Sequence, residues 1–385
     1  NKYQKFSVYS LKDQYMNILF IVNDAGVYGA NLSLANLIKS LDLKNSLVLI
    51  PSKGPLLFLL DKMNIAYLVI PFRFNSAVYD GCVSSCLLYI VRFFYYKVLN
   101  KYSYYRILKI VDDEKIDIIH TNDNRTSIGL EVASRKSIKH VLHIREFLDL
   151  DFNMRPFKPF KKLCKDFNES DSIICVSEAV KEHFHIQGAK ARVIYNAVDS
   201  VRNLHNIREK KESYFLFCGS LSEKKGVFDA IYSFSKMLKD RDLQLYIAGT
   251  GPAHIVKKIQ TVIQKENLQN KVFLLGYRND SKELMRKAIA LLMCSKYEAF
   301  GRVTAEAMLN DCLVIGRNSG GTPELIEHGK TGFLFNTNDE LTVLMEKVLS
   351  MDTTDIRDRA KEKAINSFTE EVYAEQLKLV YDSLR

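Results

Sequence analysis

The stretch from Leu292 to Phe333 constrains the fold more than any other part of the chain, because apolar runs alternate there with glycine-containing turns. The apolar run Ile289–Cys294 predicts a buried strand, and Val303–Leu309 has the residue spacing of a helix. Two glutamates, Glu298 and Glu306, lie on either side of the predicted helix start. A buried strand that leads through a glycine turn into a helix is typical of an α/β protein.

The spacing of the two glutamates limits what they can do together. Within one helix they would lie about 12 Å apart, which is too far for a carboxylate pair that hydrolyses one bond. We therefore expect them to hold two ends of one long ligand. Between them, the backbone N–H groups of Phe300, Gly301 and Arg302 stand at a helix start, where a phosphate is stabilised. A ligand with a sugar at one glutamate, a diphosphate at the helix start and a ribose at the other glutamate would be a nucleotide sugar.

The ordered set of segments in this stretch resembles the signature of the retaining family 4 glycosyltransferases. The matching segments are E-A-F-G-R-V-T-A-E, the apolar strand Leu313–Gly316, G-G-T-P-E-L-I and G-K-T-G-F. Two glutamates at this spacing occur by chance in many chains, whereas the ordered set is specific. The resemblance implies an α/β fold of GT-B architecture, in which two Rossmann-like domains face each other across a cleft and the last helix crosses back to the N-terminal domain.

A chain of 385 residues is long for a single hydrophobic core, which favours two domains. We expect residues 1–15 to be an N-terminal extension and residues 16–199 to be the acceptor-binding domain. The segment 200–213 is charged and poor in apolar residues, which predicts a linker. Residues 214–368 are then the nucleotide-sugar-binding domain, and residues 369–385 form the helix that packs back on the N-terminal domain.

By the same resemblance, most donor-binding residues lie in the C-terminal half. Lys225 lies in a glycine loop after an apolar strand and would neutralise the donor diphosphate, whereas Ser220 stands where the family has an arginine. Glu306 would hold the ribose hydroxyls, and Glu298 would contact the sugar. The full expected donor-binding set is Gly29, Ser220, Lys225, Tyr277, Arg278, Glu298, Phe300, Gly301, Arg302 and Glu306.

In the N-terminal half, Asn17–Asn23 predicts a strand and Leu32–Leu41 a helix, with a glycine loop between them that is typical of a Rossmann-like opening. In the family, this loop contacts the donor and the acceptor. Here it reads Y-G-A-N, so one glycine and one acidic residue of the family pattern are missing. Two histidines end further strands. A lone strand-end histidine is more often packed than functional, yet two that open toward one crevice favour a ligand role. The resemblance implies catalytic roles for His143, Glu298 and Lys225, and we expect acceptor contacts from Asn31, His120 and Arg145.

The segment Ser84–Lys109 interleaves basic and aromatic residues and contains no acid. A helix of this kind suits an anionic membrane surface, with rings at the headgroup level and cations near phosphates. A core-facing helix with a solvated basic edge explains the pattern almost as well. Stacking on nucleic-acid bases would need an accompanying binding motif that the sequence lacks, so we expect no nucleic-acid partner. The run 151–165, with two prolines and several lysines, is expected to be a mobile or membrane-proximal loop.

Composition adds further expectations. The formal net charge of +10 indicates an anionic partner. The histidines form no H-E-x-x-H motif or comparable ligand cluster, and the resemblance implies a metal-independent enzyme without a cofactor. No apolar run reaches the roughly 18 to 20 residues of a membrane span. We therefore expect a cytoplasmic enzyme, peripheral on the inner face of the plasma membrane.

Together these patterns predict a retaining glycosyltransferase that moves a sugar from a nucleoside diphosphate sugar to a hydroxyl of a glycan or lipid-linked acceptor, in cell-surface polysaccharide synthesis. Two other hypotheses stay open. A GT-B sugar-nucleotide epimerase would release a free, altered sugar nucleotide. A non-catalytic partner subunit with a decayed site is suggested by departures from the family pattern at Asn31, Ala197, Ser220 and Asp311.

Overall fold

The structure is a computed structural model that describes residues 16–385 apart from 80–82, 205–207 and 240. The expected extension at 1–15 lies outside the described residues. The chain divides into two compact units. The N-terminal unit ends at Ala197 and takes in Glu370–Arg385, and the C-terminal unit spans Val198–Thr369.

The segment 200–213, expected to be a linker, groups with the C-terminal unit. The reason lies in its described residues, which pack on that unit. The ammonium of Lys211 donates to the carbonyl oxygens of Arg286 (2.7 Å) and Asp311 (2.6 Å). Sequence composition marks the segment as polar, but it does not show that these polar groups have partners.

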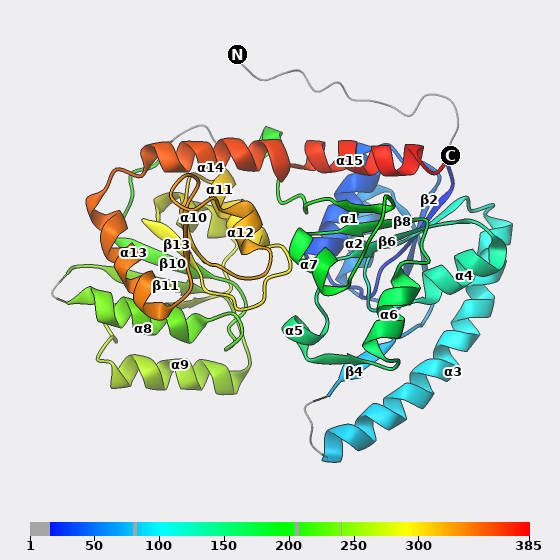
Figure 1. Ribbon diagram of the computed structural model, residues 1–385, viewed down its shortest axis with the longest axis horizontal. Helices are drawn as coiled ribbons and strands as arrows, with labels where there is room; N and C mark the ends of the chain where they lie inside the picture. The colour runs from blue at the N-terminus through cyan, green and yellow to red at the C-terminus, as the bar shows by residue number, and fades with distance from the viewer. Residues whose placement is uncertain (1–15, 80–82, 205–207, 240) are drawn as a thin grey trace. The chain divides into compact units, whose positions relative to one another are not determined.

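The N-terminal unit is built on a parallel sheet with helices on both faces (Figure 1). Over the described residues this sheet has seven strands in the order β3-β2-β1-β5-β6-β8-β9. Its strands are β1 (Ile18–Ile21), β2 (Ser46–Ile50), β3 (Ala66–Val69), β5 (Ile118–Thr121), β6 (Lys139–Ile144), β8 (Ser172–Cys175) and β9 (Ala191–Val193). Every residue of β1, β5 and β8 is buried, as expected of parallel strands that are covered on both faces.

The helices of this unit include one from the far end of the chain. They are α1 (Gly29–Ser40), α2 (Pro55–Met63), α3 (Val83–Asp113), α4 (Ile128–Lys136), α5 (Asp149–Phe152), α6 (Phe160–Phe167), α7 (Glu178–His183) and α15 (Glu370–Asp382). Helix α15 packs on α1, and both contribute to one hydrophobic cluster with β1. The last helix is therefore part of the N-terminal unit.

The run 151–165 is not the loop that the sequence predicted. Strand β7 (Met154–Pro156) lies within it and pairs antiparallel with β4 (Ser76–Val78). Helix α6 begins in the same run and buries Leu163, Cys164 and Phe167. Prolines and lysines on the solvent side hid these apolar positions, which recur at helical spacing.

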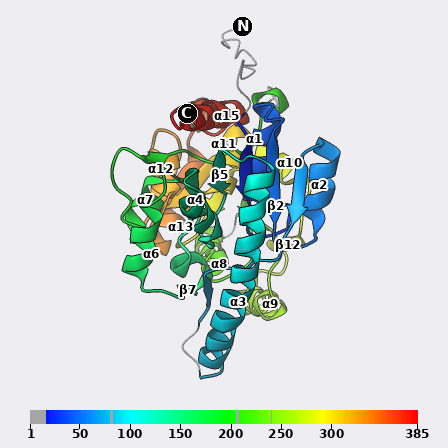
Figure 2. The same cartoon turned by 90° about the vertical axis from the view of Figure 1, so that its right-hand side faces the viewer.

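Helix α3 spans 31 residues. Its C-terminal part packs on the sheet, where Ile107 and Val111 join a hydrophobic cluster with β1 and β5. Its N-terminal half extends past the sheet beside β4 and β7 (Figures 1 and 2). There Tyr89 donates to the carbonyl oxygen of Pro156 at 2.7 Å.

The C-terminal unit repeats the Rossmann-like plan. Its sheet, over the described residues, has six parallel strands in the order β12-β11-β10-β13-β14-β15. The strands are β10 (Tyr214–Cys218), β11 (Gln244–Ala248), β12 (Val272–Gly276), β13 (Ala290–Met293), β14 (Leu313–Arg317) and β15 (Phe333–Phe335). The helices are η1 (Val201–Asn203), α8 (Val227–Leu238), α9 (Ala253–Lys265), α10 (Ser281–Lys287), α11 (Arg302–Leu309), α12 (Thr322–Leu325), α13 (Asn338–Ser350) and α14 (Thr354–Ser367).

Candidate functional site

A lysine and a glutamate meet beyond the carboxyl ends of the central strands of the C-terminal unit. The Lys225 ammonium lies 2.7 Å from a Glu298 carboxylate oxygen. Lys225 belongs to the loop after β10, and Glu298 belongs to the loop after β13, the strand that neighbours β10. Ligands of open α/β sheets bind at this edge. The sequence predicted both residues as donor-binding, and the fold brings them together.

Two glycines allow the loops around this ion pair to approach closely. Gly226 has a φ of +74°, and a Cβ there would lie 2.2 Å from the carbonyl oxygen of Cys294. Gly320 has a φ of +57°, and a Cβ there would lie 2.4 Å from the carbonyl oxygen of Glu298. Because any larger residue would push these backbones apart, both glycines fix the positions of Lys225 and Glu298.

Glu306 lies in a second charged group, on α11. The side chain is half-buried, and one of its oxygens lies 3.5 Å from the Arg302 guanidinium. Burial raises the pKa of the Glu306 carboxyl, whereas Arg302 and Lys282 lower it. Lys282 in turn pairs with Asp199, whose carboxylate is buried. Sequence reasoning missed Lys282, and only its place in the first turn of a helix could have drawn attention to it.

The other expected donor-binding residues of this unit lie near the same edge of the sheet. Gly301 is the N-cap of α11, with a φ of +102° and no side chain that could cap the first turn, and Phe300 before it is buried. Ser220 is exposed in the loop after β10. Tyr277 is 76% exposed after β12, and Arg278 pairs with Asp280.

The strand-end histidines of the N-terminal unit are buried in a hydrogen-bonded network. His120, His143 and Arg145 are 0%, 0% and 5% exposed. The rings of the two histidines stack with centroids 5.7 Å apart, and His120 Nδ1 lies 2.7 Å from the hydroxyl of Tyr381. Burial, followed by the positive charge of Arg145, holds the pKa of both histidines well below 6.5. Both rings are therefore neutral near pH 7.

Arg145 is the centre of this network. Its guanidinium donates to Asn122, to Asn196, to the hydroxyl of Tyr373 at 3.0 Å and to His143 Nδ1 at 3.2 Å. Two of these partners, Asn196 and Tyr373, lie close in sequence to the two points at which the chain passes from one unit to the other. In this structure, His120 and Arg145 contact protein groups and have almost no exposed surface, so the geometry does not support direct acceptor contacts.

The glycine loop at the start of α1 is closed by its own side chains. Asn31 is 5% exposed, and its amide donates to the carbonyl oxygen of Gly26 at 2.9 Å and to Asp24 Oδ1 at 3.1 Å. This geometry gives Asn31 a role in shaping the loop and does not support acceptor binding by its side chain. Gly29 is the first residue of α1, and Tyr28 before it is 70% exposed.

Sequence reasoning missed a charged cluster beyond β1, β5 and β6. Arg125 donates to Asp123 at 2.9 Å and lies 3.7 Å from Asp24. Glu146 is half-buried, and its Oε2 atom is enclosed without a hydrogen-bond partner among the described residues. Burial first, and then Asp123, raise the pKa of Glu146 to about 8. The signal was present in the sequence as N-D-N-R and R-E after predicted strands.

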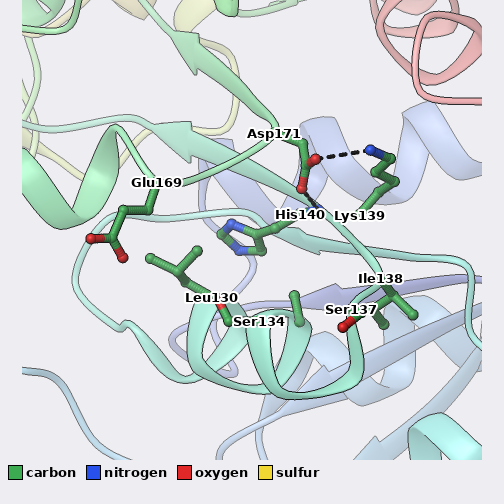
Figure 3. A pocket seen from close by; sticks show the side chains of 9 residues that line it. Leu130, Ser134, Ser137, Ile138, Lys139, His140, Glu169 and Asp171 are labelled. Atoms are coloured by element: carbon green, nitrogen blue, oxygen red, sulfur yellow. Dashed lines mark hydrogen bonds and ion pairs between the residues drawn. The ribbon is translucent and has the colours of Figure 1, made fainter.

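A cavity of about 260 Å³ lies at the opposite, amino-terminal edge of the same sheet (Figure 3). His140 lines it, with Nδ1 at 2.9 Å from the Ser170 hydroxyl and Nε2 at 2.9 Å from the Thr121 hydroxyl. Burial lowers the pKa of His140 to about 3. With both nitrogens engaged, this neutral histidine has a structural role.

Among the residues that the structure describes, no helix is both long and apolar enough to cross a membrane. In the same residues, no group of three or more histidine, cysteine, aspartate or glutamate side chains is arranged to hold a metal ion.

Comparison with known proteins agrees with the geometry of both units. The family model described as glycosyl transferases group 1 matches residues 201–367, and the model for glycosyltransferase family 4 matches residues 81–202. An uncharacterised glycosyltransferase of Methanocaldococcus jannaschii is 32% identical over 259 residues, which cover 64% of this chain and 69% of that protein. The chain belongs to the group 1 glycosyltransferases.

Two further similarities place this group 1 glycosyltransferase among known proteins. It is 27% identical over 195 residues, 49% of this chain and 51% of the relative, to the N-acetylgalactosamine-N,N'-diacetylbacillosaminyl-diphospho-undecaprenol 4-alpha-N-acetylgalactosaminyltransferase of Campylobacter jejuni. The matched stretches span about half to two thirds of the length of the first curated relatives. The crystal structure of Anabaena HepE in complex with UDP superposes with a TM-score of 0.76, at 22% identity, over 96% of this chain and 100% of that one. The fold is GT-B, with two Rossmann-like units.

Proposed function

We propose that this chain transfers a sugar, with retention and without a metal ion, from a nucleoside diphosphate sugar to a hydroxyl of a glycan or lipid-linked acceptor in cell-surface polysaccharide synthesis. The observation that carries the proposal is the Lys225–Glu298 ion pair at the ligand-binding edge of the C-terminal sheet. The names of the relatives support the acceptor class, since one of them acts on a diphospho-undecaprenol glycan. The UDP bound to HepE supports the donor class.

In this proposal each charged residue has a distinct task. Glu306, in the second turn of α11, holds the ribose hydroxyls. Lys225 and the N–H groups around Gly301 stabilise the negative charge that develops on the leaving diphosphate. Glu298 positions the sugar through its hydroxyls and is not a nucleophile. Lys225 and Glu298 pair with each other, so each charge has a partner within the protein.

We further propose that α3 lies on an anionic membrane surface, on the cytoplasmic side of the plasma membrane. One face of α3 packs on the body of the unit through Tyr89, Ile107 and Val111. The opposite face is apolar as well, and each of its residues is more than half exposed: Leu87, Val91, Phe94, Val98, Tyr102 and Tyr105. Their spacing of three and four residues places them on one stripe of the helix.

Cations flank this outward stripe on both sides. At 100° per residue, Arg92 and Arg106 lie along one edge of the stripe, and Lys97 and Lys101 lie along the other. An exposed apolar stripe of this length is unusual on a monomeric soluble protein. Rings and aliphatic side chains at the headgroup level, with cations beside lipid phosphates, would cover it.

A ligand screen followed by a transfer assay tests the reaction. We would measure the unfolding temperature of the protein with UDP, GDP, ADP and TDP sugars, since a ligand bound only by the folded state raises it. The donor that stabilises the protein would then be incubated with and without acceptor glycans. Transfer that depends on acceptor supports the proposal. Donor that changes its sugar without any acceptor would instead indicate an epimerase, and the absence of stabilisation by every donor would contradict nucleotide-sugar binding.

A further inference from the structure

A groove of about 510 Å³ lies between the C-terminal half of α3 and the sheet edge of the N-terminal unit. Its sheet side is β3, which is the last strand of the sheet on that side. Leu68 of β3 is 37% exposed and lines the groove together with Ile70 and Ile110. The groove is of the size that holds small organic ligands, and it is separate from the residues assigned to glycosyl transfer.

The helix side of the groove is aromatic and cationic. Tyr102, Tyr105, Arg106 and Lys109 line it, and Arg106 lies over the ring of Tyr102 at 6.0 Å from the ring centroid. In the part of the chain that the structure describes, neither Arg106 nor Lys109 is within ion-pair distance of a carboxylate. One acid, Asp113, also lines the groove. Two cations beside an aliphatic floor match an amphiphile with an anionic head and an apolar chain.

The groove is continuous with the outward stripe of α3, because Tyr102 and Tyr105 belong to both. We propose that this groove binds one anionic phospholipid, with the phosphate between Arg106 and Lys109 and an acyl chain against Leu68. The inference rests on the proposed membrane contact of α3 and names the lipid that this contact selects. The tyrosine rings stand where aromatic side chains of membrane proteins meet the headgroups.

Charge argues against a second copy of the chain as the occupant. A two-fold contact brings the same surface of both copies together, so it would place Arg106 and Lys109 near their own counterparts. Like charges close together are unfavourable unless an anion lies between them. A phospholipid supplies that anion.

The chain contains no tryptophan, so a Leu68→Trp variant carries a single reporter inside the groove. We would titrate it with dihexanoyl phosphatidylglycerol below its micelle concentration, where no bilayer is present. We expect a saturable shift of emission to shorter wavelength. Adding Arg106→Gln and Lys109→Gln should weaken binding at least about tenfold, because both charge-assisted contacts to the phosphate are lost. Adding Arg135→Gln and Lys39→Gln, a matched pair of exposed cations outside the groove, should change it less than about twofold.

Other outcomes would overturn the proposal. An equal response to dihexanoyl phosphatidylcholine would remove the need for a net negative head, and an equal response to inorganic phosphate would make the groove a simple anion site. Tryptophan emission that shifts with protein concentration but not with lipid would show that a second copy of the chain occupies the groove. If Leu68→Trp fails to fold, the unfolding temperature of the wild-type protein with the same lipids replaces the reporter. Neither readout depends on sugar transfer, so a failed transfer assay and a failed lipid titration are distinguishable.

Discussion

Lys225 and Glu298 hold each other through an ion pair that a donor would have to share. The lysine is about one third exposed and the glutamate less so, so a ligand can reach both without unfolding the loops. The loops can approach each other this closely only because Gly226 and Gly320 have no side chain. The geometry of the site therefore depends on these two glycines as well as on the charged side chains of Lys225 and Glu298.

Lys225→Gln should lower kcat/KM about 10- to 100-fold. The substitution removes a charge-assisted contact to the diphosphate, which is typically about 1.5 to 3 kcal/mol. Glu298→Gln should also reduce transfer, because the sugar loses its anionic partner. Initial rates at varied donor concentration measure both effects. Lys236→Gln, which breaks an exposed pair with Asp339 in the same unit, is the control, and equal rates for Lys225→Gln and this control would contradict the assignment.

Glu146 should make stability depend on pH. Its folded-state pKa of about 8 lies above the ordinary value of 4.5, so the folded state binds the proton more tightly than the unfolded state does. The free energy of unfolding should therefore fall as pH rises from about 4.5 to about 8. Glu146→Gln should flatten that fall by at least about 1.4 kcal/mol, the equivalent of one pKa unit. Urea unfolding at pH 5 and pH 8 checks this, and parallel pH profiles for both proteins would refute it.

At the scale of elements, α3 has two apolar faces. The inner face is buried by the main sheet and by the two-stranded β4–β7 sheet, and the outer face has no cover from the described residues of its unit. The inner face holds such a helix in the fold, and the outer face exposes apolar side chains that can contact another apolar surface. Its two faces also explain why the sequence pattern suited a core helix and a membrane helix almost equally.

Phe94→Asp together with Val98→Asp should reduce binding to vesicles that contain anionic lipid, since both residues lie in the outward stripe of α3. Neutralising Arg92, Lys97, Lys101 and Arg106 should also reduce it, and more so at low salt. Co-sedimentation with such vesicles is the measurement. Phe58→Asp, which alters an exposed aromatic residue on α2, should have little effect. Binding that survives all four charge changes would contradict the membrane contact.

Sequence patterns predicted elements well where the physical signal is local. Buried strands such as β1 and β13 are continuous apolar runs, and the start of α11 is marked by its glycine. The surroundings of His120 and Arg145 could not be predicted, because their partners Tyr381 and Tyr373 lie more than 200 residues away in the sequence. The groove between α3 and β3 could not be predicted from the sequence either, because Leu68 and Arg106 come together only when β3 pairs at the sheet edge.

At the scale of the whole molecule, the chain passes between its units twice, near Ala197 and near Thr369. The guanidinium of Arg145 contacts residues close to both crossings, Asn196 and Tyr373. Helix α15 closes the N-terminal unit by burying Tyr373, Leu377 and Tyr381 against it. Stability of this unit therefore depends on residues from both ends of the sequence.

Removing residues 370–385 should destabilise the N-terminal unit and spare the C-terminal unit. The deletion exposes apolar surface of α1 and leaves His120 and Arg145 without their tyrosine partners, and buried groups left unsatisfied cost about 1 to 3 kcal/mol each. Hydrogen exchange measured by mass spectrometry should be faster in peptides of β1, β5 and β6 and little changed in β10 and β13. Uniform acceleration in both units would contradict this division.

The position of α15 also has a consequence for how the protein is made. A ribosome completes the whole C-terminal unit before it adds the helix that covers α1. Until then, α1 and β1 lack their permanent cover on that face, and His120 Nδ1 lacks its hydroxyl partner Tyr381. The half of the molecule that is made first is thus the last to reach its final structure.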